Sequence, residues 1–268
     1  MKEIDSIIEF RNIQLEILCS FDVFCREHNI KYSLAYGSLI GVIRHRGFIP
    51  WDDDIDLYMT RNEYIKLIET FPQYLNKKYK IACLERDEKW NRAYAKIYDC
   101  RTILIEQVRN NVGIGVGIDV FPLDEIPSEE TLRRSYLKKM HRLKSFYTLK
   151  SLKLSRRRPL LKNIIIVVSR LLTWPISYRY LAEFISARAQ QFNGTNTGYL
   201  FDNAEGYYSS SPFLMSHFDE YIDMPFEGHF FMVMSGWHDV LTKTFGNYMQ
   251  LPPEEEQIPH HCFKAFRK

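Results

Sequence analysis

The sequence lacks the features that define several large classes of protein. None of its apolar runs reaches the roughly 18–20 residues that span a bilayer, and its first residues lack the apolar core of a secretory signal. Its five cysteines are scattered and include no Cys-x-x-Cys pair, which argues against a disulfide framework. With 12 glycines and 11 prolines among 268 residues, it is neither collagen-like nor of low complexity. We therefore expect a globular protein of the reducing cytoplasm.

Three familiar catalytic or nucleotide-binding signatures are also missing. The chain contains neither a phosphate-binding loop ending in Gly-Lys-Ser/Thr nor the Gly-x-Ser-x-Gly turn of many hydrolases. The alternating glycines Gly113, Gly115 and Gly117 precede a predicted strand, whereas the dinucleotide-binding turn follows one. These absences disfavour P-loop, hydrolase and dinucleotide-binding chemistry.

Acidic residues are absent from one long segment. Residues 131–182 contain 14 Lys and Arg residues and no Asp or Glu, whereas the rest of the chain has 22 basic residues against 33 acidic ones. Such a segment attracts nucleic acid, an anionic lipid surface or a phosphorylated substrate, unless it is a solvated helical face whose acidic partners lie elsewhere. Within it, an arginine triplet at 156–158 precedes an apolar run over 164–174, interrupted by Arg170. That run suits a buried helix or one lying in the plane of a membrane surface.

The distribution of hydrophobic residues divides the chain into three parts. Strand-like alternation is concentrated in a β-rich core at about residues 30–125, helical signals dominate a basic segment at about 128–192, and a mixed segment covers 193–268. No internal repeat or long linker separates them, so we expect one domain over residues 1–268. The pattern predicts an α+β fold, with a mixed β-sheet flanked by helices. The strands are predicted at 32–36, 54–59, 79–84, 93–99, 102–105 and 118–121, and the first helix at about 4–28.

The most informative segment is the acidic run that follows Pro50 and Trp51. In a strand, alternate side chains share a face, so Asp54 and Asp56 would point the same way, about 7 Å apart. Two such carboxylates can converge on a hard divalent cation that keeps positions open for substrate phosphates. Without a cation their repulsion would raise one pKa. The segment therefore suits phosphoryl chemistry.

Three other interpretations of this acidic run remain. It can be an acidic loop without a ligand, or Asp52 and Asp53 can be the ligands in place of the next two acids. A calcium loop of the EF-hand type would use Asp52 first and Glu63 in the twelfth position, but the sixth position needs glycine and holds Leu57. The alternation favours Asp54 and Asp56 as the ligand pair.

One long motif also carries a family resemblance. Gly-Ser-Leu-Ile-Gly at 37–41, followed by Arg-His-Arg-Gly-Phe-Ile-Pro-Trp-Asp-Asp-Asp-Ile-Asp at 44–56, resembles the LicD family, relatives of fukutin and fukutin-related protein with a nucleotidyltransferase-type fold. Gly-Ile-Asp-Val-Phe-Pro-Leu-Asp at 117–124 resembles the third acidic motif of that family. Residues 248–253, followed by His260 and His261, resemble its C-terminal tail. Members transfer a phosphorylated alcohol, most often phosphocholine from CDP-choline, to a sugar hydroxyl of a surface glycan.

The resemblance implies roles for five residues of the chain. Gly37 and Ser38 would form the turn on the phosphate side. Asp54 and Asp56 would hold Mg²⁺ or Mn²⁺, and Asp119 would be the third carboxylate of the catalytic set. Asp119 would either complete the metal site or accept the proton from the sugar hydroxyl.

Other side chains are candidates for contacts with the donor. Arg44 closely follows the Gly-Ser turn, and Lys96 lies on a predicted strand, so both are candidate phosphate contacts. The trimethylammonium group of choline would pack on aromatic faces, for which Trp51, Trp90 and Tyr94 are candidates. Each of these rings can equally be part of the core.

The sequence thus predicts a metal-dependent transferase of the LicD type. It would move phosphocholine or a related phospho-alcohol from a CDP-linked donor to a hydroxyl of a cell-surface glycan or teichoic acid precursor. Such precursors are commonly lipid-linked, so we expect peripheral contact with the inner membrane face through residues 150–176 and no nucleic acid partner. The alternatives are a nucleotidyltransferase acting on RNA or a small molecule, and a non-catalytic module that binds glycan or lipid.

Overall fold

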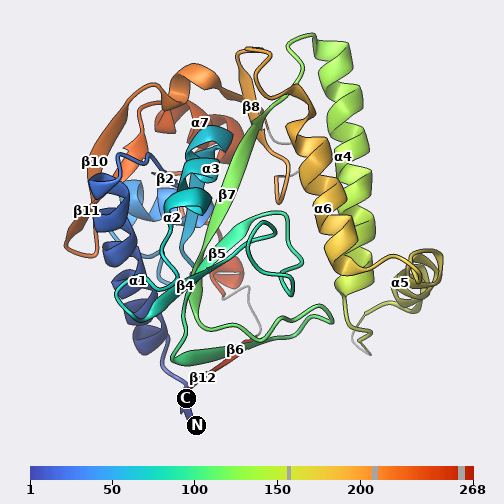
Figure 1. Cartoon of the computed structure of the whole chain (residues 1–268), viewed down its shortest axis with the longest axis horizontal. Coiled ribbons are helices and arrows are strands. Elements are labelled where there is room, and N and C mark those ends of the chain that lie inside the picture. Colours follow the sequence, from blue (N-terminus) through green and yellow to red (C-terminus); the bar gives the residue numbers. More distant parts are fainter. Residues whose placement is uncertain (156–157, 207–210, 259–262) are drawn as a thin grey trace.

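The centre of the fold is a mixed β-sheet (Figure 1). The computed structural model describes residues 1–155, 158–206, 211–258 and 263–268, and within these residues the sheet has seven strands. The first five follow the order β2-β3-β7-β5-β4, and β8 and β9 extend the sheet from β7. β3 and β7 run parallel, and the other pairs are antiparallel. The strands are β2 (Ser33–Leu34), β3 (Asp56–Thr60), β4 (Tyr79–Ala82), β5 (Ala95–Asp99), β7 (Gly117–Glu125), β8 (Tyr199–Asp202) and β9 (Phe213–Leu214).

Helices from the first half of the chain pack on this sheet. α1 (Ile7–Glu27) is capped by Ser6, whose side chain accepts the Glu9 N–H, and it contacts β5 and β7. Its buried apolar side chains recur at helical spacing, as the sequence pattern predicts. α3 (Arg61–Thr70) contacts β3 and β7. The short α2 (Tyr36–Ile40) continues into a π-helical turn over Gly41–His45 and lies against β3.

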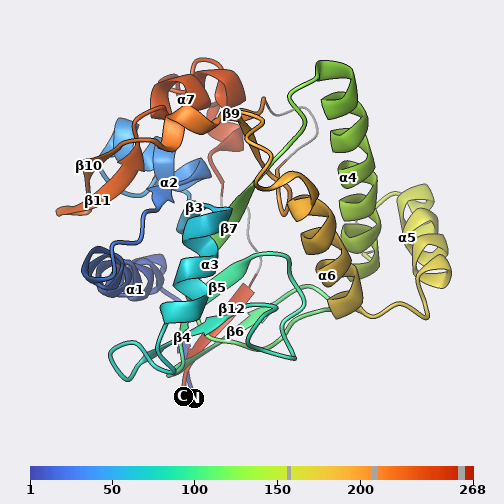
Figure 2. The ribbon, with the colours of Figure 1, turned by 45° about the horizontal axis from the view of Figure 1, so that its top comes forward.

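The basic segment forms a separate helical layer beside the sheet (Figures 1 and 2). It comprises α4 (Glu130–Ser151), α5 (Leu160–Leu172) and α6 (Tyr178–Ala189), and α4 contacts both of the others. The helical stretch predicted over 128–192 is therefore interrupted twice, near Pro159 and Pro175, because proline lacks the N–H that continues a helix. A small hydrophobic cluster from α4, α6 and β8 joins this layer to the sheet. Among the described residues, no helix combines the length and the apolar character required to cross a bilayer.

The two ends of the chain meet in a second, three-stranded sheet. β12 (Phe263–Arg267) lies between β1 (Lys2–Ile4) and β6 (Thr102–Glu106), so both termini lie together in Figures 1 and 2. The C-terminal part also contributes a hairpin that packs against β2. The hairpin consists of β10 (Tyr221–Phe226) and β11 (His229–Met234), and α7 (Trp237–Phe245) follows it. Short 3-10 turns lie at Gln190–Phe192, Met215–Phe218 and Glu254–Glu256.

The α+β prediction is confirmed, with one difference at the acidic run. The strand predicted over 54–59 begins at Asp56, so Asp54 lies in the preceding turn. The Ile55 carbonyl already accepts the Asp119 N–H at 3.0 Å, which makes it the first ladder contact with β7. Alternation along a strand therefore does not determine the direction of the Asp54 side chain.

Candidate active site

Adjacent strands bring two of the predicted carboxylates side by side. β3 and β7 are paired in a register that places Asp56 next to Asp119. On the other side of β7, the register with β5 places Lys96 opposite Asp119, and the Lys96 Nζ lies 2.9 Å from the Asp119 Oδ1. These three residues form one row across the sheet. Neighbouring carboxylates repel each other unless cations compensate them, and Lys96 supplies one positive charge.

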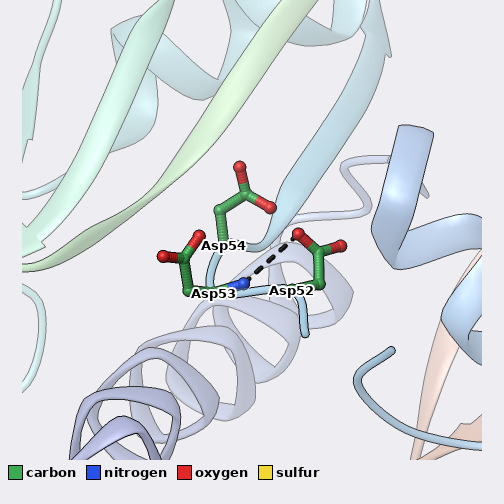
Figure 3. Close-up of side chains that lie close together, drawn as sticks. All are labelled: Asp52, Asp53 and Asp54. Atoms are coloured by element: carbon green, nitrogen blue, oxygen red, sulfur yellow. Dashed lines mark hydrogen bonds between the residues drawn. The ribbon is translucent and has the colours of Figure 1, made fainter. Parts of the chain in front are cut away.

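Three further carboxylates lie in the turn that precedes β3 (Figure 3). One carboxylate oxygen from each of Asp52, Asp53 and Asp54 lies within 4.8 Å of the others. The Asp53 N–H donates a hydrogen bond of 3.2 Å to the Asp52 Oδ1. Asp54 thus lies in one group with Asp52 and Asp53, and Asp56 lies close enough for the charges of Asp54, Asp119 and Asp52 to act on its pKa. We call Asp52–Asp54, Asp56 and Asp119 the acidic cluster.

Burial and mutual repulsion act strongly on the acidic cluster. Burial, followed by the charge of Asp54, raises the pKa of Asp52 to about 8. Burial, with Asp54 and Asp119 next, raises the pKa of Asp56 well above its usual value. Burial also raises the pKa of Asp119, and Lys96 partly offsets this effect. Full ionisation of the cluster at neutral pH is therefore costly without a further cation, and its oxygen donors fit a hard divalent ion such as Mg²⁺.

Gly37 and Ser38, the predicted turn on the phosphate side, lie in α2 next to the acidic cluster. The Asp56 N–H donates a hydrogen bond of 3.0 Å to the Ser38 Oγ, and Ser38 is buried. At Gly37 a Cβ atom would lie only 2.2 Å from the Asp52 Oδ2. Gly37 thus leaves the space that the Asp52 carboxylate occupies, and Ser38 fixes the start of β3. Both contacts position members of the acidic cluster.

An arginine that the sequence analysis missed holds the acidic turn in place. Arg11, on α1, donates from Nε to the Asp52 carbonyl oxygen and from Nη2 to the Ile49 carbonyl oxygen, each at 2.9 Å. These contacts connect positions about 40 residues apart in the chain. No local motif signals them, because they depend on how α1 packs beside the turn.

A cavity lies beside the acidic cluster, between the loop before β5 and the helices α4 and α6. Its volume is about 780 Å³, which lies within the range of small-ligand sites. Arg92 connects the two features, because it lines the cavity and its charge lowers the pKa of Asp119. Arg92 also donates a hydrogen bond of 2.7 Å to the Tyr94 hydroxyl and pairs with Glu106. The charged and aromatic lining includes Arg92, Tyr94, Glu106, His141, Lys144, Tyr147 and Glu205.

A second group of polar side chains adjoins the cavity, and two of them, Lys144 and Glu205, line it. The Tyr36 hydroxyl donates a hydrogen bond of 2.5 Å to the buried Asp202, whose other oxygen accepts the N–H groups of Ala204 and Glu205. Burial lowers the pKa of Lys144, although Asp202 partly offsets the effect. Solvent reaches the Glu205 carboxylate, but the surrounding cavity walls raise its pKa to about 7, with Asp202 as the next cause. None of these residues was predicted from the sequence as part of the site.

The structure places the remaining predicted side chains outside the acidic cluster. Arg44 donates to the Tyr248 carbonyl oxygen at 2.8 Å and so contacts the C-terminal segment. Trp90 is 1% exposed, and its Nε1 donates to the Tyr94 carbonyl oxygen at 2.7 Å. Trp51 is partly buried against the main core. Of the three rings predicted for choline, only Tyr94 is in the lining of the 780 Å³ cavity among the described residues.

The structure also bears on two other motifs. A calcium loop does not fit, because Asp56 begins a strand and Glu63 lies on α3, where its carboxylate accepts the Lys31 N–H at 2.8 Å. The paired histidines of the C-terminal motif, His260 and His261, lie outside the residues that the structure describes.

Comparison with known proteins agrees with this arrangement. Residues 29–157, which contain the whole acidic cluster, match the family described as LicD/FKTN/FKRP, nucleotidyltransferase domain. The chain is 34% identical over 255 residues to the lipopolysaccharide cholinephosphotransferase LicD of Haemophilus influenzae, covering 94% of each protein. An uncharacterized protein of Rickettsia typhi is 30% identical over 99 residues, which are 37% of this chain and 30% of that protein. An uncharacterized protein of Rickettsia prowazekii is 42% identical over 48 residues, 18% of each chain. The chain therefore belongs to the LicD family.

Proposed function

We propose that the protein is a divalent-metal-dependent transferase that moves phosphocholine, or a related phospho-alcohol, from a CDP-linked donor to a glycan hydroxyl. The carrying observation is the acidic cluster on adjacent strands beside a cavity of about 780 Å³. Similarity over 94% of the chain to a lipopolysaccharide cholinephosphotransferase supports both the transferred group and a sugar acceptor. The acceptor is a lipopolysaccharide sugar or, alternatively, a teichoic acid precursor.

The carboxylate oxygens of the acidic cluster fit a metal ion, which we expect the reaction to require. Asp54, Asp56 and Asp119 would hold Mg²⁺ or Mn²⁺, with Asp52 and Asp53 close by. When bound, the ion neutralises charge on the phosphoryl oxygens. It would also lower the cost of keeping the buried carboxylates ionised, which their raised pKa values indicate.

Side chains of the cavity are suited to hold and orient the donor. Arg92 and Lys144 line it, and cationic groups of this kind bind phosphate oxygens. His141 lines the cavity as well. Tyr94 and Tyr147 are aromatic residues of the same lining, and aromatic faces attract quaternary ammonium groups. Asp119 lies on β7 between Asp56 on β3 and Lys96 on β5, and the Lys96 ammonium contacts it. A donor in this cavity would therefore present its diphosphate to the acidic cluster, where an acceptor hydroxyl can approach in line.

The test is transfer from CDP-choline to a lipopolysaccharide-derived acceptor, read by mass spectrometry of the product and by release of CMP. We expect transfer with Mg²⁺ and none after chelation with EDTA. Asp56→Asn should lower the rate by at least about a hundredfold, whereas Asp219→Asn, at an exposed carboxylate, should leave it unchanged. CDP-ethanolamine, CDP-ribitol and CDP-glycerol, tested in parallel, identify the phospho-alcohol.

Several outcomes would overturn the proposal. Full activity in EDTA or in Asp56→Asn would refute the metal site. Pyrophosphate release from CTP, without CMP release from any CDP-linked donor, would indicate nucleotidyl transfer instead. Binding of donor or glycan with no turnover over the whole donor panel would indicate a non-catalytic module.

A further inference from the structure

Helix α5 carries an unusual number of exposed apolar side chains. Eight of its residues and Trp174, just beyond its end, are between 40% and 80% exposed. Only Ile166 and Ser169 of this helix are buried. We call these nine residues the α5 outer face: Leu160, Leu161, Ile164, Ile165, Val167, Val168, Leu171, Leu172 and Trp174.

The side of α5 that faces the protein buries Ile166 and Ser169, and polar contacts hold the helix near both of its ends. Lys150, at the end of α4, donates from Nζ to the carbonyl oxygens of Thr173 at 2.5 Å and Ile176 at 2.7 Å. Asn163 donates to the Ser155 carbonyl oxygen at 2.9 Å. A helix on a water-exposed surface normally turns its apolar residues inward and its polar residues outward, whereas most apolar residues of α5 point outward. The α5 outer face is therefore built to meet an apolar environment.

The charge around α5 indicates which apolar environment this is. Residues 131–182 contain no acidic residue, and Lys153 and Lys162, next to and within α5, are exposed. Arg158, the last residue of the arginine triplet, lies two positions before α5, whereas Arg156 and Arg157 fall outside the described residues. An apolar helix face with a basic surround matches the interface of an anionic bilayer, which attracts Lys and Arg and takes up apolar side chains.

A second copy of the chain fits this surface less well. A two-fold interface brings the same patch of both molecules together, so each basic surround would meet another basic surround. We propose that the α5 outer face inserts into the interfacial region of a membrane rich in anionic lipid. The helix lies in the membrane plane, and the basic residues contact the headgroups.

This docking would place the cavity close to the membrane. Its lining continues along α4 from Lys144 to Ser151, next to Lys150, which anchors the end of α5. If the proposed function holds, a lipid-linked acceptor can then reach the cavity without leaving the bilayer. Membrane binding itself does not depend on the transfer reaction, so the two can fail separately.

Cosedimentation with vesicles tests the docking. The full chain should bind vesicles of equal parts phosphatidylglycerol and phosphatidylcholine and bind vesicles of phosphatidylcholine alone at least about tenfold more weakly. Ile164→Glu combined with Val168→Glu should weaken binding to the anionic vesicles by about a hundredfold. Leu132→Glu combined with Phe230→Glu adds the same charge at exposed apolar positions on α4 and β11 and should bind like the wild type.

Three further readouts distinguish insertion from other behaviour. The emission of Trp174 should shift to the blue when anionic vesicles are added, and Trp174→Phe should remove this shift. Failure of the wild type to bind, or equal binding by the α5 variant, would overturn the proposal. Sedimentation equilibrium showing a dimer that the α5 variant abolishes would assign the outer face to a second copy instead. Unchanged transfer to a water-soluble acceptor by the α5 variant would show that the active site is intact.

Discussion

Gly37 shows how closely the backbone approaches the acidic cluster. Because the Asp52 Oδ2 lies 2.2 Å from where a Cβ atom would be, Gly37→Ala must displace that carboxylate. We expect the free energy of unfolding to fall by about 1–2 kcal/mol. The rate of transfer should fall by at least about tenfold. Urea unfolding and rates of CMP release measure the two effects.

A double variant provides the control for this clash. In Gly37→Ala combined with Asp52→Ala the displaced carboxylate is gone, so the loss of stability caused by the methyl group should largely disappear. Additive effects of the two changes would show that the methyl group clashes with something other than Asp52.

Glu205 should make stability depend on pH. Its pKa is raised to about 7 in the folded protein, against ~4.3 in an unfolded chain. The folded state therefore binds this proton more tightly, and stability should fall as pH rises between these two values. Glu205→Gln removes this loss. The free energy of unfolding of the variant, relative to that of the wild type, should therefore be about 1 kcal/mol higher at about pH 8 than at about pH 5. The gain is small because solvent reaches the carboxylate.

Unfolding free energies of the two proteins at both pH values measure this gain. A difference between variant and wild type that stays constant from the lower to the higher pH would contradict the assigned effect of the cavity.

Sequence alone could identify part of this site. Asp54 and Asp56 lie in one uninterrupted motif, and Asp119 lies in another. Each motif can be recognised in the sequence without knowledge of the fold. Arg11 and Arg92 contact the site from other elements, and their roles follow only from packing. The predicted metal and donor roles of these residues remain predictions.

At the scale of elements, α3 is joined to β7 by a buried ion pair. Arg61, the first residue of α3, donates from Nε and Nη2 to the two Asp124 oxygens at 2.8 and 2.7 Å. Removing one partner of a buried pair leaves an uncompensated charge. We expect Arg61→Met to lower the free energy of unfolding by about 3–5 kcal/mol, as measured by urea denaturation.

The matched control removes the second charge as well. Arg61→Met combined with Asp124→Leu should recover more than half of the lost stability, because no charge is then buried alone. Equal destabilisation by the single and the double variant would mean that the pair contributes mainly through packing.

Element types were easier to predict than their partners. Alternation found β3, β5 and β7, and helical spacing found α1. The long helical pattern of the basic segment masks the breaks at Pro159 and Pro175, so the segment appears continuous in the sequence. The pairing of β8 with β7, and of β12 with β1 and β6, depends on contacts between distant parts of the chain, which hydrophobic periodicity does not contain.

At the scale of the whole molecule, the sheet and the helical layer divide the chemistry between them. The sheet and the turn before β3 supply the acidic cluster, and the helical layer, which lies beside the sheet in Figure 2, supplies the segment without acidic residues. The cavity is lined by residues of α4, of α6 and of the loop before β5. The charge asymmetry of the sequence, with 14 basic and no acidic residues over 131–182, is thus an arrangement in space. A basic segment of this kind attracts anionic partners.

The central claim is that carboxylates from β3, β7 and the preceding turn bind one common divalent cation. Anomalous diffraction from a crystal soaked with Mn²⁺ tests it most directly, because the ion identifies its own position. We predict a peak within bonding distance of Asp56 and Asp119, which disappears in Asp56→Asn. A wild-type crystal with no peak at these side chains, or with the ion bound only elsewhere, would contradict the account.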